Sequence, residues 1–385
     1  MRQPDRECGN RGGATYTRAV VTGDGARLHV AIDANVLEAA WGGIPKYLHR
    51  IAEELAAGGD RVDLLINRRG WTTTIPGAHA VNLRLRGRPL WRELAVPAWM
   101  LRHRPDVLWA PEGVLPRRGP LPGVVTVHDL APLLLPGTKP PALEQEYRTS
   151  RPRSARSAAR VICVSETTAR DVADQWGVPR DRLAVVPNGV DERFRPGDTE
   201  IARATVRERY GVQGPFVLHV GSIEPRKGLE VLFSASAGAD WTLVLAGSPG
   251  FKGEGLVADA SRAGAVLIRG ADDDDLVSLY RAAEAVAAPA LYEGFGIVPL
   301  EAMACGTPAV VAANAGALEE VSGAAAIVVA DRDPEAWRAG IAEARRRRPE
   351  LATTGLAHAA RFRWPQVAAA TRAVLVEAAR GRGPS

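Results

Sequence analysis

The chain has 385 residues, of which 46% are hydrophobic and 24% charged, and these fractions are ordinary for a soluble globular protein. No apolar run reaches the roughly 18–20 residues needed to span a bilayer, and the polar, Gly-rich N-terminal segment lacks the core of a signal peptide. Three scattered cysteines favour a reducing, cytoplasmic setting without a metal cluster. The length exceeds one ordinary hydrophobic core and therefore predicts two domains.

The basic residues are nearly all Arg, because only four of the 49 are Lys, at positions 46, 139, 227 and 252. A coding bias toward Arg accounts for this and for much of the formal charge of +5, although such a charge would also suit anionic substrates or an anionic membrane surface. Lys is a compact point charge that Arg replaces poorly. Each of the four lysines is therefore a candidate for a specific contact.

Strands alternate with helices along the first half of the chain. Residues 1–26 are expected to form a disordered extension. The pattern after this extension is typical of a parallel sheet covered by helices on both faces. It predicts strands at residues 28–33, 62–66, 106–109, 124–127, 161–164 and 183–186, and helices at 44–57, 141–158 and 166–176.

The alternation restarts after a linker at residues 191–199. The predicted fold class is therefore α/β, with two doubly wound, Rossmann-like domains at 27–192 and 200–363 that face each other across a cleft. Ligands of such sheets bind at the carboxyl ends of the strands, where most of the motifs below fall. Predicted strands of the second half are 216–220, 241–246, 265–268, 285–287 and 309–311, and predicted helices are 228–238, 274–283, 299–305, 334–346 and 364–380.

The segment 291–308 carries the strongest functional signal. It reads Leu-Tyr-Glu-Gly-Phe-Gly-Ile-Val-Pro-Leu-Glu-Ala-Met-Ala-Cys-Gly-Thr-Pro, which puts Glu293 beside a Gly-Phe-Gly turn and Glu301 in the first turn of a helix that Pro299 can start. Helix N-termini offer free N–H groups to phosphate, and the turn glycines let backbone N–H groups approach a ligand closely. Carboxylates accept hydrogen bonds from hydroxyl groups. The segment thus predicts a site for a sugar joined to a phosphate.

A second motif, Gly221-Ser-Ile-Glu-Pro-Arg-Lys-Gly228, follows the predicted strand 216–220 and opens a helix. Gly221 permits a tight turn, while Arg226 and Lys227 put two cations at a helix N-terminus, where they are unfavourable unless an anion is bound. The motif predicts a diphosphate clamp, and a solvated basic turn is the plain alternative.

Five further candidates follow predicted strands and also allow a purely structural explanation. His128 and Asp129 come after the strand 124–127, where a His serves as a proton carrier, a sugar contact or a structural residue. Gly42, Gly43 and Asn188 lie in turns, where a phosphate contact, a role at a hinge and simple turn formation all remain open.

Residues 84–104 combine Trp91, Trp99 and Met100 with a series of Arg. We interpret this stretch as a core-packed helix with a solvated basic face, in preference to a helix that docks on a membrane surface or an acceptor.

With these motifs the chain resembles glycosyltransferase family 4, whose members are retaining, sugar-nucleotide-dependent enzymes of the GT-B fold. The resemblance covers residues 28–380 and is most specific at Glu293–Glu301 and its continuation to Pro308. One departure is the run Ala288-Pro-Ala-Leu-Tyr292, where the family often has a Ser, and this makes the donor choice less defined. Other matching segments are Gly221–Gly228, Val127–Leu130, Val164–Glu166 and Pro187–Asp191.

The resemblance implies a role for each candidate. Glu293 would contact hydroxyls of the transferred sugar and Glu301 the ribose, while Arg226 and Lys227 would hold the diphosphate and stabilise the leaving group. The helix at 364–385 would cross back to the first, acceptor-binding domain. Gly42, Gly43, Gly221, Ser222, Gly294, Phe295 and Gly296 would contact the donor, His128 would lie near the sugar and the acceptor, and Asp129 and Asn188 would serve an acceptor contact or a hinge.

The implied reaction moves a hexose-type sugar from a nucleoside diphosphate sugar to an acceptor hydroxyl, with no cofactor, no metal and no nucleic-acid partner. The acceptor is expected to be a lipid-linked saccharide or a small natural product. Two alternatives stay open: a sugar-nucleotide isomerase that resembles a 2-epimerase, and an inactive nucleotide-sugar-binding protein. The sequence does not identify the sugar, the base, the acceptor, the linkage, the oligomeric state or a contact with the membrane.

Overall fold

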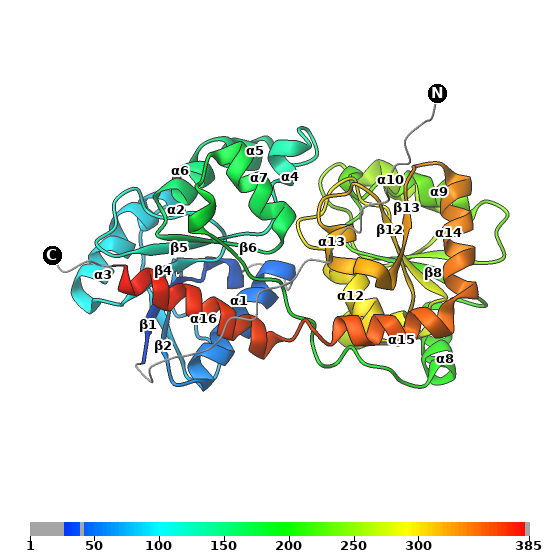
Figure 1. The fold of residues 1–385 in the computed structure, drawn as a ribbon, viewed down its shortest axis with the longest axis horizontal. Coiled ribbons are helices and arrows are strands. Elements are labelled where there is room, and N and C mark those ends of the chain that lie inside the picture. The colour runs from blue at the N-terminus through cyan, green and yellow to red at the C-terminus, as the bar shows by residue number, and fades with distance from the viewer. Residues whose placement is uncertain (1–26, 39–41, 382–385) are drawn as a thin grey trace, which may run out of the picture.

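The computed structural model describes residues 27–38 and 42–381, and the chain is arranged as two lobes, each built on one parallel sheet (Figure 1). The extension predicted at residues 1–26 and the last residues of the predicted terminal segment lie outside the described residues. The α/β class and the two parallel sheets are confirmed.

The first lobe holds a seven-stranded parallel sheet in the order β3-β2-β1-β4-β5-β6-β7. The strands at its centre are buried apolar runs, because helices cover both faces. The strands are β1 (His29–Asp33), β2 (Arg61–Ile66), β3 (Ala78–Asn82), β4 (Val107–Ala110), β5 (Gly123–Val127), β6 (Arg160–Cys163) and β7 (Leu183–Val185). The helices are η1 (Asn35–Glu38), α1 (Gly43–Ala57), α2 (Arg88–Leu90), the π-helical turn η2 (Trp91–Ala95), α3 (Val96–His103), α4 (Ala131–Leu134), α5 (Pro141–Arg148), α6 (Ser150–Ser157), α7 (Glu166–Trp176) and η3 (Arg180–Arg182).

The second lobe holds a six-stranded parallel sheet in the order β10-β9-β8-β11-β12-β13. Both sheets follow the Rossmann strand order, and β8 and β11 flank the point where the order of the second sheet reverses. The strands are β8 (Phe216–Val220), β9 (Thr242–Ala246), β10 (Val266–Ile268), β11 (Ala285–Ala288), β12 (Ala309–Ala312) and β13 (Ala326–Val329). The helices are α8 (Thr199–Tyr210), η4 (Pro225–Lys227), α9 (Glu230–Ser236), α10 (Glu254–Arg262), α11 (Asp273–Ala282), α12 (Ile297–Ala304), α13 (Leu318–Ser322), η5 (Gly323–Ala325), α14 (Pro334–Arg346) and α15 (Arg348–Ala359).

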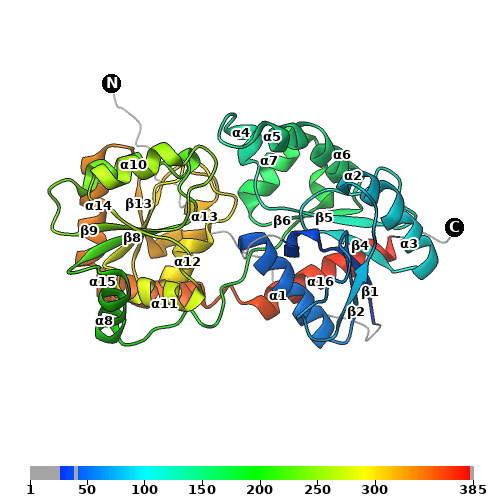
Figure 2. The ribbon, with the colours of Figure 1, turned by 180° about the vertical axis from the view of Figure 1, so that it is seen from behind.

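The last helix, α16 (Trp364–Arg380), leaves the second lobe and packs against α1 of the first (Figures 1 and 2). The two crossing segments run side by side, since the Val190 amide donates to the Phe362 carbonyl at 2.8 Å. A Cβ on Gly189 would lie 2.6 Å from the Trp364 ring, so only Gly lets the ring approach this closely.

Several predicted helices differ in extent from those in the structure. The predicted helix 141–158 is two helices, α5 and α6, that break at Thr149. Pro152 accounts for the break, because its ring and missing N–H oppose a continuous helix through residue 148. The predicted helix 299–305 begins earlier, at Ile297. The exposed edge strand β3 lacks an apolar run, which is why the sequence did not reveal it.

Candidate active site

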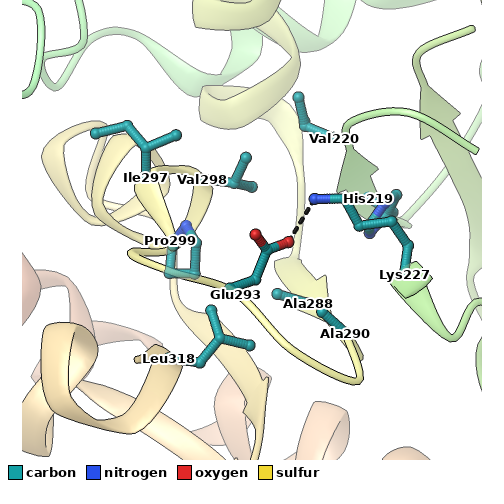
Figure 3. A pocket seen from close by; sticks show the side chains of 11 residues that line it. His219, Val220, Lys227, Ala288, Ala290, Glu293, Ile297, Val298, Pro299 and Leu318 are labelled. Atoms are coloured by element: carbon teal, nitrogen blue, oxygen red, sulfur yellow. Dashed lines mark hydrogen bonds and ion pairs between the residues drawn. The ribbon is translucent and has the colours of Figure 1, made fainter. Parts of the chain in front are cut away.

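The sequence-predicted cations and carboxylate meet at the switch point of the second sheet. Arg226 Nη1 lies 3.0 Å from Glu293 Oε2, and Lys227 Nζ bonds the other carboxylate oxygen, Glu293 Oε1. In Figure 3, Lys227 extends toward Glu293 across a pocket. The Leu291 amide donates to the Arg226 carbonyl at 2.8 Å and joins the two motifs directly.

Local backbone geometry places the two cations. Gly221 has φ of 137°, which a non-Gly residue rarely adopts, and its ideal Cβ position lies 3.5 Å from Lys227 Nζ. The cations stand in the short 3-10 turn η4, which ends at Gly228 with φ of 60°. The prediction that they open a helix is therefore wrong, since α9 begins only at Glu230. Carboxylates, rather than a helix dipole, set their electrostatics.

Glu293 is held by backbone and side chain together. Its amide donates to the Ala315 carbonyl at 3.1 Å, and its carbonyl accepts from the Ala317 amide at 2.8 Å. Burial would raise the pKa of the carboxyl, but Lys227 and Arg226 outweigh burial and lower it to about 2. Glu293 is therefore an anion at every physiological pH.

Helix α12 starts beside this carboxylate. Gly296, with φ of 93°, caps the helix and brings the free amides of its first turn to the pocket. Because the helix begins at Ile297, Glu301 lies just beyond the first turn, and the prediction that Pro299 starts the helix is wrong. The ring of Phe295 is buried and meets Phe362 edge-on at 6.0 Å, so only its backbone is available to a ligand.

Glu301 occupies a different environment from Glu293. It accepts a hydrogen bond of 2.8 Å from the Tyr280 hydroxyl, and burial raises the pKa of its carboxyl to about 7 against the opposing field of Lys46. Lys46 reaches this region from α1 in the other lobe and pairs with Asp273 at 3.2 Å. The carboxylate is thus available to a hydroxyl-bearing ligand that supplies further hydrogen bonds.

A pocket of about 60 Å³ lies between Lys227, Glu293 and the start of α12 (Figure 3). Its polar side chains are those two and His219, whose Nδ1 hydrogen-bonds the Ala287 carbonyl at 3.0 Å. Burial lowers the pKa of His219 to about 4, and its Nε2 has no hydrogen-bond partner among the residues that the structure describes. No pattern in the sequence singled out this histidine.

The first lobe meets the site through the end of β5. A Cβ on Gly294 would lie 1.8 Å from the His128 carbonyl oxygen and 2.7 Å from Asp129 Cβ. His128 Nε2 hydrogen-bonds the Pro111 carbonyl at 2.9 Å, and burial lowers the pKa of its imidazole to about 4. A neutral ring favours the interpretation of His128 as a polar contact over that of a proton carrier.

Helix α7 fastens the same loop from the first lobe. Ser165 Oγ and Thr168 Oγ1 donate to the Gly294 carbonyl at 2.7 and 3.0 Å. The side chain of Glu320, in α13 of the second lobe, also reaches α7, and its carboxylate accepts from the Glu166 and Thr167 amides at 2.7 and 2.8 Å. Val164–Glu166 stood out in the sequence only as a segment that matches the family, and no pattern there revealed these contacts between the lobes, which we call the latch.

The remaining candidates are not drawn into the cluster by any contact that we see in the described part of the chain. Gly42 and Gly43 are exposed at the start of α1, and Ser222 lies in the turn after β8. Asn188 follows β7, and its buried Oδ1 has no partner among the described residues.

All four lysines lie at the site or between the lobes. Besides Lys227 and Lys46, Lys139 pairs with Glu224 at 2.7 Å, and Lys252 donates to the Gly137 carbonyl at 2.9 Å. Their scarcity in an Arg-rich chain was the signal that marked each of them as a candidate for a specific contact.

The fold defines a class. The structure of sucrose-phosphate synthase from Thermosynechococcus elongatus superposes with a TM-score of 0.72 at 20% identity over 89% of this chain and 96% of that one. The Anabaena protein Alr3699/HepE, solved in complex with UDP-glucose, has a TM-score of 0.69 at 21% identity over 90% and 97% of the two chains. The fold is therefore GT-B.

Sequence comparison gives the family. Residues 41–194 match the model "Glycosyltransferase Family 4", and residues 203–354 match "Glycosyl transferases group 1". A D-inositol 3-phosphate glycosyltransferase of Frankia alni is 31% identical over 85% of this chain and 92% of its own length. O-antigen chain mannosyltransferase B of Escherichia coli is 31% identical over 69% of this chain and 73% of its own. The chain belongs to glycosyltransferase family 4.

Other relatives match over a smaller part of their length. The alignment covers 56% of the D-inositol 3-phosphate glycosyltransferase of Salinispora arenicola, at 34% identity, and 48% of that of Salinispora tropica, at 36%. The chain thus spans about half the length of these relatives. Among the described residues, no helix is both long and apolar enough to cross a membrane.

Proposed function

We propose that the protein is a retaining glycosyltransferase that moves a hexose-type sugar from a nucleoside diphosphate sugar to an acceptor hydroxyl. The observation that carries the proposal is the contact of Arg226 and Lys227 with Glu293 at the start of α12. This arrangement combines cations and free amides for a diphosphate with a carboxylate for sugar hydroxyls, at a sheet position typical of nucleotide sites.

Leaving-group stabilisation is the main task of this site. As the bond between the anomeric carbon and the phosphate oxygen breaks, negative charge grows on that oxygen. Arg226 and Lys227 stabilise the charge, and the amides of the first turn of α12 add to it, without a metal. Glu293 orients the sugar through its hydroxyls, Glu301 accepts from the ribose, and Gly221, Ser222, Gly294 and Gly296 bind the donor through their backbones, as do Gly42, Gly43 and Phe295.

The acceptor enters on the same face of the sugar. Its hydroxyl oxygen bonds to the anomeric carbon while its proton passes to an oxygen of the departing diphosphate, so the configuration is retained. The contact of Gly294 with His128 and Asp129 supports this geometry, because it brings the first lobe beside the sugar site. Closure of the lobes would also exclude water and limit hydrolysis of the donor.

The proposed donor and acceptor rest on the relatives and on one structural neighbour. Several relatives are named as D-inositol 3-phosphate glycosyltransferases and one as a mannosyltransferase, while one structural neighbour holds UDP-glucose. We propose a UDP- or GDP-hexose as donor, and as acceptor a saccharide on a lipid carrier or a small hydroxylated molecule. No nucleic acid is involved.

A surface on the first lobe fits a cytoplasmic protein that rests on an anionic membrane. Trp91, Trp99 and Met100 are buried, in accord with the core-packed interpretation, but the opposite side of the same helices is also apolar. Spacings of four and seven residues put three exposed leucines on one helical face, with exposed Arg at 84, 86, 88, 102 and 104 around them. We call Leu90, Leu94 and Leu101, which are 54%, 58% and 63% exposed, the leucine face.

A thermal-shift screen with UDP-, GDP- and dTDP-sugars tests the donor site, because a ligand that binds the folded state raises the melting temperature. With the best donor and an acceptor, Lys227→Ala and Glu293→Ala should lower turnover by roughly 100-fold or more, and both variants should remain folded. Lys252→Ala is the matched control. Wild-type turnover in both site variants would refute the assignment, and an epimerised donor formed without acceptor would favour the isomerase.

A further inference from the structure

Lys139 belongs to a continuous chain of ion pairs that runs from the first lobe into the donor site. It lies between α4 and α5, and its Nζ donates to Glu224 Oε2 at 2.7 Å. Glu224 Oε1 accepts from Arg226 Nη2 and Nε at 3.0 and 3.2 Å. Arg226 in turn contacts Glu293, whose other oxygen binds Lys227. We call these five side chains the ion chain.

Charge counting separates the contributions of the two lobes. The second lobe supplies two cations and two carboxylates to the ion chain, so on its own its part of the chain is electrically neutral. Lys139, from the first lobe, leaves the assembled chain with one net positive charge. The negative charge of Asp129, also from the first lobe, acts on Arg226 and on Tyr147, where the charge of Arg151 opposes it.

Burial makes this single charge effective. The side chains of Glu224 and Arg226 are 2% and 9% exposed, and that of Lys139 is 22% exposed. Charges in such surroundings interact more strongly and are screened less by salt than charges on an open surface. Because Glu224 is almost fully withdrawn from water, its negative charge offsets that of Arg226 unless a second cation, here Lys139, shares it.

We infer that Lys139 neutralises Glu224 from across the domain interface, so that the positive charge of Arg226 remains available to attract the diphosphate of the donor to the ion chain. The inference rests on the proposed function. Lys139 acts through Glu224 and is a positioning residue. Because Lys139 reaches Glu224 only when the lobes are together, anion binding and closure favour each other, as reciprocal coupling requires.

The chain offers a matched control for the test. Lys252 also bridges the lobes, and it carries the same charge, but it donates to the carbonyl of Gly137 in the loop that holds Lys139. Lys252→Met and Lys139→Met therefore remove the same charge and one bridge each. Only Lys139→Met breaks the ion chain.

A double-mutant cycle between Lys139 and Glu224 gives the decisive measurement. Affinities for UDP, GDP and dTDP are measured by calorimetry on the whole protein at low and moderate salt. Lys139→Met should weaken binding of the preferred diphosphate about 5- to 10-fold, and less at the higher salt. Lys252→Met should stay within about twofold of wild type.

Glu224→Gln keeps an oxygen acceptor for Arg226 but makes the second-lobe cluster positive, so it should bind the diphosphate at least as tightly as wild type. In that background Lys139→Met should change the affinity by less than about twofold, as expected when its partner charge is gone.

Several outcomes would overturn the inference. One is a Lys139→Met affinity equal to that of wild type or of Lys252→Met. Another is an equal loss in the wild-type and Glu224→Gln backgrounds, because that result would mean a role in loop geometry. If the wild-type protein bound none of the three diphosphates, the proposed function itself would fall, and the two failures are therefore distinguishable.

Discussion

Replacing Gly294 with Ala tests whether the close approach of the two lobes is needed for turnover. The φ of Gly294 is not positive, so Ala fits its backbone, but the new Cβ would stand 1.8 Å from the His128 carbonyl oxygen. Reaching even 3.0 Å requires the lobes to separate locally by about 1.2 Å. That movement takes the bonds from Ser165 and Thr168 to the Gly294 carbonyl, now 2.7 and 3.0 Å, out of hydrogen-bonding range.

Two buried hydrogen bonds at a net ~1 kcal/mol each amount to about 2 kcal/mol, or about a 30-fold shift away from the closed arrangement. We therefore expect Gly294→Ala to lower turnover about 30-fold and to weaken binding of the free nucleoside diphosphate by a smaller factor, because anion binding and closure are coupled, while its melting temperature stays close to wild type. Steady-state kinetics, thermal melting and calorimetry measure the three quantities. Gly255→Ala, where an added Cβ has nothing within 4 Å, is the control. Unchanged turnover in Gly294→Ala would refute the reasoning, and so would a loss explained entirely by unfolding.

Three other perturbations have defined outcomes. Glu320→Gln weakens the charge-assisted bonds to the start of α7 and should lower turnover about tenfold, with a smaller loss of nucleotide affinity; equal losses of both would contradict the latch. The raised pKa of Glu301 means that the folded state holds a proton that the unfolded state releases from about pH 4.5, so stability falls as pH rises toward 7. Glu301→Gln should thus be more stable than wild type at pH 8, by up to about 3 kcal/mol, and equal to it near pH 4.5, while binding nucleotide less tightly; calorimetric melts at both pH values decide this. Replacing the leucine face with three Gln should reduce sedimentation with phosphatidylglycerol vesicles at least fivefold, whereas Ile201→Gln, at another exposed apolar residue, should not.

Sequence periodicity was sufficient for the fold because most strands are buried apolar runs separated by amphipathic helices. It was insufficient where burial is weak or a helix is interrupted. Edge strand β3 contains only half-buried and exposed residues, and the α5–α6 break depends on one Pro inside a helical pattern. Elements of that kind depend on packing by neighbours that are distant in the sequence.

Motif spacing identified the groups of the site but not their partners. That Arg226, Lys227 and Glu293 lie together follows from the sheet order, since β8 and β11 are neighbours. No local pattern revealed that Lys139, 85 residues before Glu224, would extend this cluster from the other lobe. Its only trace was that a chain rich in Arg kept Lys there, where a slender side chain with a point charge meets a buried carboxylate.

The two carboxylates of segment 291–308 show most clearly what spacing leaves undetermined. Both are acidic residues of one motif, yet the structure moves their pKa values in opposite directions, to about 2 for Glu293 and about 7 for Glu301. Both are removed from water, so burial alone would raise both. Two direct ion pairs reverse the effect at Glu293, whereas Glu301 has a tyrosine hydroxyl and only the more distant field of Lys46. A hydroxyl of the donor can donate to either carboxylate. At Glu293 it must compete with Arg226 and Lys227, whereas at Glu301 it adds to the hydrogen bond from Tyr280. Nucleotide should therefore bind first through the ribose and diphosphate, and the sugar should be seated as the diphosphate draws the cations toward itself.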